Sequence, residues 1–370
     1  MSQMESMQPR ARVLAYYLPQ FHPIPENDKW WGKGFTEWTN VGKAKPLFPG
    51  HYQPHVPADL GYYDLRVPET RKAQAQMAKE YGIEGFVYWH YWFGNGKQLL
   101  ERPFKEVLES GEPDFPFALA WANETWKGFW FGVDGNRNPL IEQTYPGDED
   151  YIAHFYSVLP AFRDPRYIQC EGKPVFFVYR PEQCPHIRHF IELWREMAVE
   201  NGLPGIYFIG IKYSLYGKDE AEDAYHRLKG FGFDSINVVN TYDWPISDLK
   251  YRIIRKIFFK QMKVIPDIRP YRYEQFASPI DEKIDVIPTI APNWDHTPRT
   301  GEKGIVLLGS TPDHFQGCLH RMLDTIQDKD FDHRFLVIKS WNEWAEGNYL
   351  EPDLRYGKLY LEALQKEVVR

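Results

Sequence analysis

The sequence predicts a (β/α)8 barrel. Eight short apolar runs, rich in β-branched and aromatic residues, alternate with longer segments of helical character, as in a parallel sheet with crossover helices. No low-complexity linker or internal repeat divides the chain, and its 370 residues are within the range of one barrel. We therefore expect a single barrel domain at residues 11–370, after a disordered tail at residues 1–10.

The apolar runs and the segments between them set the order of the elements. The expected strands are residues 13–18, 85–92, 117–122, 174–179, 206–211, 235–239, 285–291 and 335–340. The expected helices are residues 69–81, 103–110, 148–162, 185–201, 219–229, 247–262, 312–326 and 356–369. Local signals support several of them: Pro68 opens the first helix, Gly82 follows it, and Thr311 precedes Pro312 as a capping residue.

Two long insertions follow the first and third expected strands. Residues 19–64 and 123–147 are both rich in glycine and aromatic residues. Loops of such length are usually functional or disordered. The density of rings in residues 19–64 favours an ordered cover over one end of the barrel.

Composition excludes several classes of protein. Residues 1–10 have no secretory signal and no segment reaches the length of a membrane span, so we expect a cytoplasmic protein. Three widely spaced cysteines do not suggest a disulfide framework or a thiolate metal site. A net charge of -7 with both signs interspersed argues against nucleic acid.

Aromatic residues make up 16% of the chain, including 13 tryptophans and 24 tyrosines. Tryptophan and tyrosine have polar edges that need partners when they are buried. Flat rings with polar rims suit the C–H faces and hydroxyl edges of sugars, although the same rings can also pack in a core. Composition alone leaves both interpretations open.

Polar and aromatic residues gather at the expected strand ends, which in this type of barrel face a common cavity. The candidate sugar-binding residues there, and in the first insertion, are Tyr17, Trp38, His90, Tyr91, Trp92, Asn123, Glu124, Trp126, Tyr179, Tyr242, Trp294, Asn342 and Trp344. His90 fits a hydrogen-bonded core position as well as a sugar contact.

Two glutamates follow the last expected strand, in the segment SWNEWAEGNYLEPD. Two carboxyl groups flanking one bond are the minimum apparatus for hydrolysing a glycoside. On a helical turn, Glu343 and Glu346 would be about 5 to 6 Å apart at Cβ, which suits a retaining mechanism. The alternatives are a structural pair that bonds the loop backbone, or catalysis by Glu124 together with Glu343.

Other chemistry has weaker support. Asp295, Glu37 and Asp243 are better suited to binding hydroxyl groups than to catalysis. The twelve histidines are scattered and no HExxH or paired CxxC occurs, so neither a metal nor another cofactor is expected. The expected partner is an oligosaccharide or polysaccharide.

Four motifs resemble, in order, those of the WbsX-like family of bacterial polysaccharide gene clusters, which is similar to glycoside hydrolase family 99, the endo-acting α-mannosidases and mannanases. They are AYYLPQFHPIPENDKWWGKGFTEWTNV, YWHYWFGNG, ALAWANETW and SWNEWAEGNYLEPD. The resemblance implies a cofactor-free retaining hydrolase of α-linked, mannose-like residues in a bacterial polysaccharide or O-antigen-type glycan.

The resemblance also implies roles for the two glutamates. Glu343 would deprotonate the 2-hydroxyl of the substrate, which attacks the anomeric carbon to give a 1,2-anhydro sugar, and Glu346 would act as general acid and then as base. Ala345 stands where well-known family 99 members have histidine. A glycosyltransferase of polysaccharide or O-antigen synthesis is the main alternative, although no nucleotide-sugar fingerprint is evident. A noncatalytic glycan-binding barrel is the third.

Overall fold

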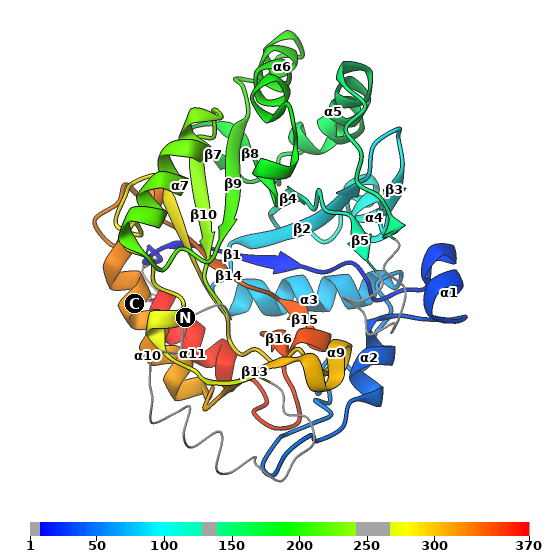
Figure 1. Cartoon of the computed structure of the whole chain (residues 1–370), viewed down its shortest axis with the longest axis vertical. Helices are drawn as coiled ribbons and strands as arrows, with labels where there is room; N and C mark the ends of the chain where they lie inside the picture. Colours follow the sequence, from blue (N-terminus) through cyan, green and yellow to red (C-terminus); the bar gives the residue numbers. More distant parts are fainter. Residues whose placement is uncertain (1–7, 128–138, 242–266, 370) are drawn as a thin grey trace, which may run out of the picture.

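The computed structural model describes residues 8–127, 139–241 and 267–369, and its centre is a closed ring of eight parallel strands (Figure 1). Each strand pairs with the next along the chain, and the last pairs with the first. The strands are β1 (Arg12–Tyr17), β2 (Gly85–Trp92), β4 (Phe117–Trp121), β8 (Lys173–Val178), β9 (Tyr207–Tyr213), β10 (Ser235–Val239), β12 (Val286–Ile290) and β14 (Phe335–Ile338). The predicted (β/α)8 barrel is therefore confirmed.

Helices surround this ring, as the crossover pattern predicts (Figure 1). They are α3 (Pro68–Glu80), α4 (Arg102–Ser110), α5 (Asp148–Phe162), α6 (Ile187–Glu200), α7 (Lys218–Gly230), α10 (Pro312–Ile326) and α11 (Leu359–Val368). The predicted cap of α10 forms, because the Thr311 side chain accepts the His314 N–H at 3.2 Å. The helix predicted at residues 247–262 lies outside the described residues.

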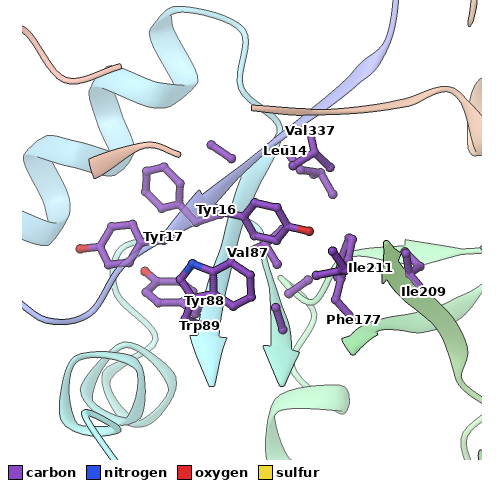
Figure 2. Packing of buried hydrophobic residues seen from close by; sticks show 14 of the residues in the cluster. Leu14, Tyr16, Tyr17, Val87, Tyr88, Trp89, Phe177, Ile209, Ile211 and Val337 are labelled. Atoms are coloured by element: carbon purple, nitrogen blue, oxygen red, sulfur yellow. The ribbon is translucent and has the colours of Figure 1, made fainter. Parts of the chain in front are cut away.

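Adjacent residues of each strand face opposite sides of the barrel wall. Tyr16 points into the barrel, where it stacks on Trp89 at 4.6 Å and donates a hydrogen bond to Asn237 across the ring. Tyr17 points the opposite way and bonds Gln74 of α3 (Figure 2). This alternation decides which strand residues can reach a site at the barrel mouth.

Several connections gather where β1 and β14 end (Figure 1). The insertion after β1 forms α1 (Pro25–Trp31) and α2 (Glu37–Lys43), and the connection after β12 forms α9 (Thr297–Thr300). After β14 come β15 (Asn342–Glu343), a 3-10 turn at Trp344–Glu346 and β16 (Asn348–Tyr349). The helices α2 and α9 contact this turn and each other, so three distant parts of the sequence meet at one end of the barrel.

Three buried asparagines clamp neighbouring strand ends together. Each asparagine side chain forms two hydrogen bonds with a single residue that follows the adjacent strand. The amide oxygen accepts the backbone N–H of that residue and the amide nitrogen donates to its backbone C=O, at 2.7 to 3.2 Å. The pairs are Asn123 with Arg180, Asn240 with Leu215 and Asn342 with Leu18. These bonds satisfy backbone groups that leave the sheet ladder inside the protein.

Replacing Asn240 by alanine is expected to lower the free energy of unfolding by about 1 to 3 kcal/mol, because buried backbone groups of Leu215 and Ala277 lose their partner. Urea denaturation of wild type and variant measures the difference. An unchanged free energy of unfolding would mean that water replaces the amide at no cost and that the clamp does not stabilise the barrel.

Candidate active site

Glu343 and Glu346 converge on one nitrogen. Nη1 of Arg299 lies 3.3 Å from Oε1 of Glu343 and 2.5 Å from Oε1 of Glu346. The two oxygens can be no farther apart than the sum of these distances, about 6 Å, which is compatible with the roughly 5 to 5.5 Å between carboxyl groups in retaining glycosidases. The turn between them is a 3-10 helical turn preceded by a short strand that ends at Glu343.

Arg299 joins the pair to a third glutamate. It lies on α9 with 9% of its side chain exposed, and its Nε is 3.2 Å from Oε2 of Glu37 on α2, which is fully buried. Burial lowers the pKa of Arg299, but Glu37, Glu346 and Glu343 outweigh this effect and raise it. The sequence suggested Glu37 only as a hydroxyl-binding residue, and no sequence pattern pointed to Arg299.

The surroundings of Glu343 shift its pKa. Burial and the nearby charge of Glu346 raise the pKa of Glu343, against Lys339 and Arg299. Its Oε2 is buried without a hydrogen-bond partner among the described residues, and Nζ of Lys339 is 3.8 Å away. An unbonded carboxylate oxygen of this kind can accept a substrate hydroxyl. His296, whose pKa burial lowers to about 3, lies 3.5 Å from Glu346 as a neutral neighbour.

Asp295 holds the turn at Trp344–Glu346 in place through hydrogen bonds. Its backbone N–H donates to the Glu346 C=O at 2.7 Å. Its carboxylate is bonded by His51 at 2.7 Å, Gln53 at 2.6 Å and Thr297 at 2.6 Å. The sequence suggested that Asp295 binds substrate hydroxyls, but in the structure its carboxylate is occupied by protein groups and ties three loops together.

The buried carboxylate of Glu351 also supports this turn. Trp344 stacks on Tyr349 at 3.7 Å and donates its indole N–H to Glu351 at 2.6 Å. Glu351 also accepts hydrogen bonds from Tyr63 and Gln74. Burial raises the pKa of Glu351 to about 7. Trp344, 1% exposed, is therefore part of this support.

Replacing Glu351 by glutamine is expected to flatten the pH dependence of stability. The pKa of Glu351 is raised from 4.5 to about 7 in the folded state. At pH values between these two, Glu351 is therefore protonated in the folded protein and ionised in the unfolded chain. The contribution of Glu351 to the free energy of unfolding therefore falls as pH rises across this window. Urea unfolding of wild type and E351Q over the window measures the slopes. The control is Glu109→Gln, on an exposed side chain; equal slopes for wild type and E351Q would contradict the prediction.

Some predicted aromatic residues lie near the carboxylates or pack against their neighbours. Burial raises the pKa of Tyr91, and the charge of Glu343 adds to this effect. Tyr91 is two residues from Trp89 on β2 and therefore lies on the same, barrel-facing side of the strand. Trp126 packs against Tyr91 edge to face at 5.1 Å. Trp38 packs against Trp344 at 5.5 Å. Trp294 lies under Nζ of Lys339 at 5.5 Å.

Tyr179 and Glu124 both contact Arg180, which follows β8. Tyr179 contacts Trp89 and the guanidinium of Arg180, which forms an ion pair with Glu124 at 3.3 Å. Burial raises the pKa of Glu124. No hydrogen bond or ion pair within the described residues joins Glu124 to Glu343, so the structure gives this alternative pair no direct contact.

Three other predicted residues point away from the pair. Tyr17, His90 and Trp92 lie on the helix-facing side of their strands. His90 meets His154 of α5 at 2.8 Å between ring nitrogens, and Trp92 stacks on the same histidine at 4.7 Å and donates to Asp150. The alternation of side chains along β1 and β2 explains this, because only every second residue faces the barrel interior.

The amides of Asn123 and Asn342 form the strand-end clamps and also donate to Tyr145 and Tyr63, respectively. Tyr242 and Asp243 lie outside the described residues. Within residues 8–127, 139–241 and 267–369, no group of three or more His, Cys, Asp or Glu side chains is arranged to hold a metal ion. In the same ranges, no helix has the length and apolar character to cross a membrane.

Comparison with known proteins agrees with this architecture. The profile of the family described as glycosyltransferase WbsX matches residues 13–364. Two curated relatives, each called uncharacterized protein WxcX, come from Xanthomonas campestris pv. campestris strains B100 and ATCC 33913. Both are 36% identical to this chain over 97% of its length. The chain spans about half the length of these relatives, 50% in each case.

Solved structures share the fold at low sequence identity. A GH99 endo-alpha-mannosidase from Bacteroides thetaiotaomicron superposes with a TM-score of 0.55 at 14% identity, covering 96% of this chain and 95% of the other. A protein described as glycoside hydrolase-like gives a TM-score of 0.60 at 17% identity, covering 99% and 96%. At these identities the similarity shows a common barrel fold.

Proposed function

Since this chain belongs to the glycosyltransferase WbsX family, whose barrel it shares with a family 99 mannosidase, we propose that it is a glycan-active enzyme that hydrolyses α-linked, mannose-like residues with retention of configuration. The observation that carries the proposal is the convergence of Glu343 and Glu346 on Arg299. The proposed substrate is a bacterial polysaccharide or an O-antigen-type glycan.

The proposed reaction has two steps, each with a balanced proton transfer. Glu343 takes the proton of the 2-hydroxyl while O2 bonds to the anomeric carbon, and Glu346 gives a proton to the departing glycosidic oxygen. Water then attacks the anomeric carbon of the 1,2-anhydro sugar and gives a proton to Glu346, while Glu343 returns its proton to O2. Two inversions at one carbon give net retention.

The first step needs Glu343 ionised and Glu346 protonated. Burial and the nearby Glu346 raise the pKa of Glu343, while Lys339 and Arg299 oppose this shift. These two positive charges favour the ionised form of Glu343, and its Oε2 has no hydrogen-bond partner among the described residues, so this oxygen can receive the proton of the 2-hydroxyl.

The decisive experiment is incubation with mannose- and rhamnose-containing bacterial polysaccharides, followed by NMR of the first product anomer. The expected product is a reducing sugar released in the α configuration. Initial release of the β anomer would exclude retention and reject the proposal.

The family description favours a second candidate, a glycosyltransferase of polysaccharide or O-antigen synthesis. That function predicts release of nucleotide from a sugar donor only when an acceptor glycan is present. Measuring nucleotide release beside the NMR experiment separates the two functions. Glycan binding without any product would instead identify a noncatalytic binding barrel.

A further inference from the structure

We infer that Arg299 is a positioning residue that sets the spacing and the charge of the Glu343–Glu346 pair, and that Glu37 in turn holds Arg299 and limits its effect. The inference rests on the proposed function, because it concerns the same pair of carboxylates. It adds to that function two residues from other loops, neither of which has a role in the proposed proton transfers.

The first support is the geometry of the guanidinium. One nitrogen, Nη1, contacts both members of the pair, and Nε contacts Glu37 on the other side. A planar guanidinium holds its donors in fixed directions, so these contacts fix three carboxylates relative to one rigid group. Bonded at both ends, the side chain has little freedom to leave the pair.

The second support is the charge of the buried cluster. Three carboxylates surround one guanidinium, and Oε1 of Glu37 and Oε2 of Glu343 have no hydrogen-bond partner within the described residues. Among the described residues, Lys339, His296 and Tyr91 also lie close to members of the cluster. Two carboxylates this close repel each other strongly in a buried site. The positive charge of Arg299 offsets that repulsion within the pair, and the negative charge of Glu37 cancels part of this effect.

Arg299→Met and Glu37→Gln should therefore shift the pH profile of kcat/KM in opposite directions. The acidic limb of kcat/KM reports ionisation of the base in the free enzyme. Arg299→Met removes a positive charge next to the pair, so this limb should move to higher pH by about 1 to 3 units. Glu37→Gln removes a negative charge and leaves Arg299 more effective, so the limb should move to lower pH. Arg299→Lys keeps the charge but loses the fork, so kcat should fall while the limb stays close to that of wild type.

Arg166 provides the matched control. It pairs with Asp164 at 2.6 Å, with 8% and 12% of the two side chains exposed, and it lies over Phe117 at the start of β4, the opposite end of the barrel. Arg166→Met should lower stability and leave the acidic limb in place. A purely structural role for Arg299 would give the same result for Arg299→Met.

Infrared titration of the carboxyl stretch gives a readout that needs no substrate, with E343Q and E346Q identifying the bands of the pair. The expected result is that these bands titrate at higher pH in Arg299→Met and at lower pH in Glu37→Gln. Bands that stay in place, or move in the same direction in both variants, would overturn the inference. If the wild type cleaves no glycan, the proposed function fails while the titration still decides the role of Arg299.

Discussion

Replacement of Glu343 or Glu346 by glutamine is expected to lower kcat by about 10²- to 10⁴-fold, the usual contribution of a positioned acid or base. Glutamine has nearly the shape of glutamate, but its side-chain amide cannot serve as an acid or a base. Both side chains are held by Arg299, so the fold and the affinity for glycan should change little. Rates of product formation test the prediction, and calorimetric titration with glycan tests the unchanged binding.

The two variants should also separate the roles of the pair. An aryl glycoside with an acidic leaving group needs little protonation, so it should restore the first step in the variant that lacks the acid. The proposed assignment expects this rescue in E346Q and not in E343Q; the reverse result would exchange the roles. Glu124→Gln tests the alternative pair: inactivation by E124Q and E343Q, with E346Q active, would transfer the second role to Glu124.

Replacement of Gly347 by alanine is expected to lower kcat by about 10²-fold, because a displacement of about 1 Å at a catalytic group has that effect. Gly347 directly follows Glu346 and has φ +59°, and a Cβ atom there would lie 2.8 Å from Cβ and 2.9 Å from N of Asp295. Asp295 cannot retreat freely, since it is bonded to Glu346, His51 and Gln53. The turn must therefore move, and Glu346 moves with it.

Gly357 is the matched control for this change. Its φ of +54° is nearly the same, but a Cβ atom there would meet nothing within 4 Å. Both alanine variants have the backbone strain of a positive φ, and only Gly347→Ala has the steric conflict. The expected outcome is a loss of thermal stability in both variants, larger in Gly347→Ala because of the steric conflict, and a loss of kcat in Gly347→Ala alone. Equal kcat values for the two variants would show that the position of the turn does not limit catalysis.

The barrel could be predicted because its signal is local and repeated. Each strand is an apolar run, and several of the described helices have boundary signals of their own, as at Pro68 and Thr311. The eight strands match the eight predicted runs within one or two residues. The short elements of the loops, such as α2 and α9, were not predicted, since they depend on contacts with each other and with the turn after β14.

The site was predicted only in part. The Glu343–Glu346 pair stands in one short segment, so its spacing could be read directly. The sequence also places Tyr17, His90 and Trp92 at strand ends, but the side of the wall that each faces depends on the register of the whole ring. The asparagines at strand ends suit a sugar and a backbone clamp equally well, because both use the same amide donors and acceptor.

The sequence by itself determined the barrel, the order of its elements and the two glutamates after the last strand, because these follow from patterns within short stretches of chain. Only the tertiary structure decided what surrounds that pair. Glu37 and Arg299 are 262 positions apart in the chain and meet 3.2 Å from each other. No local pattern encodes such a contact, since it arises from the closure of the ring, which brings the loops after β1, β12 and β14 to one end.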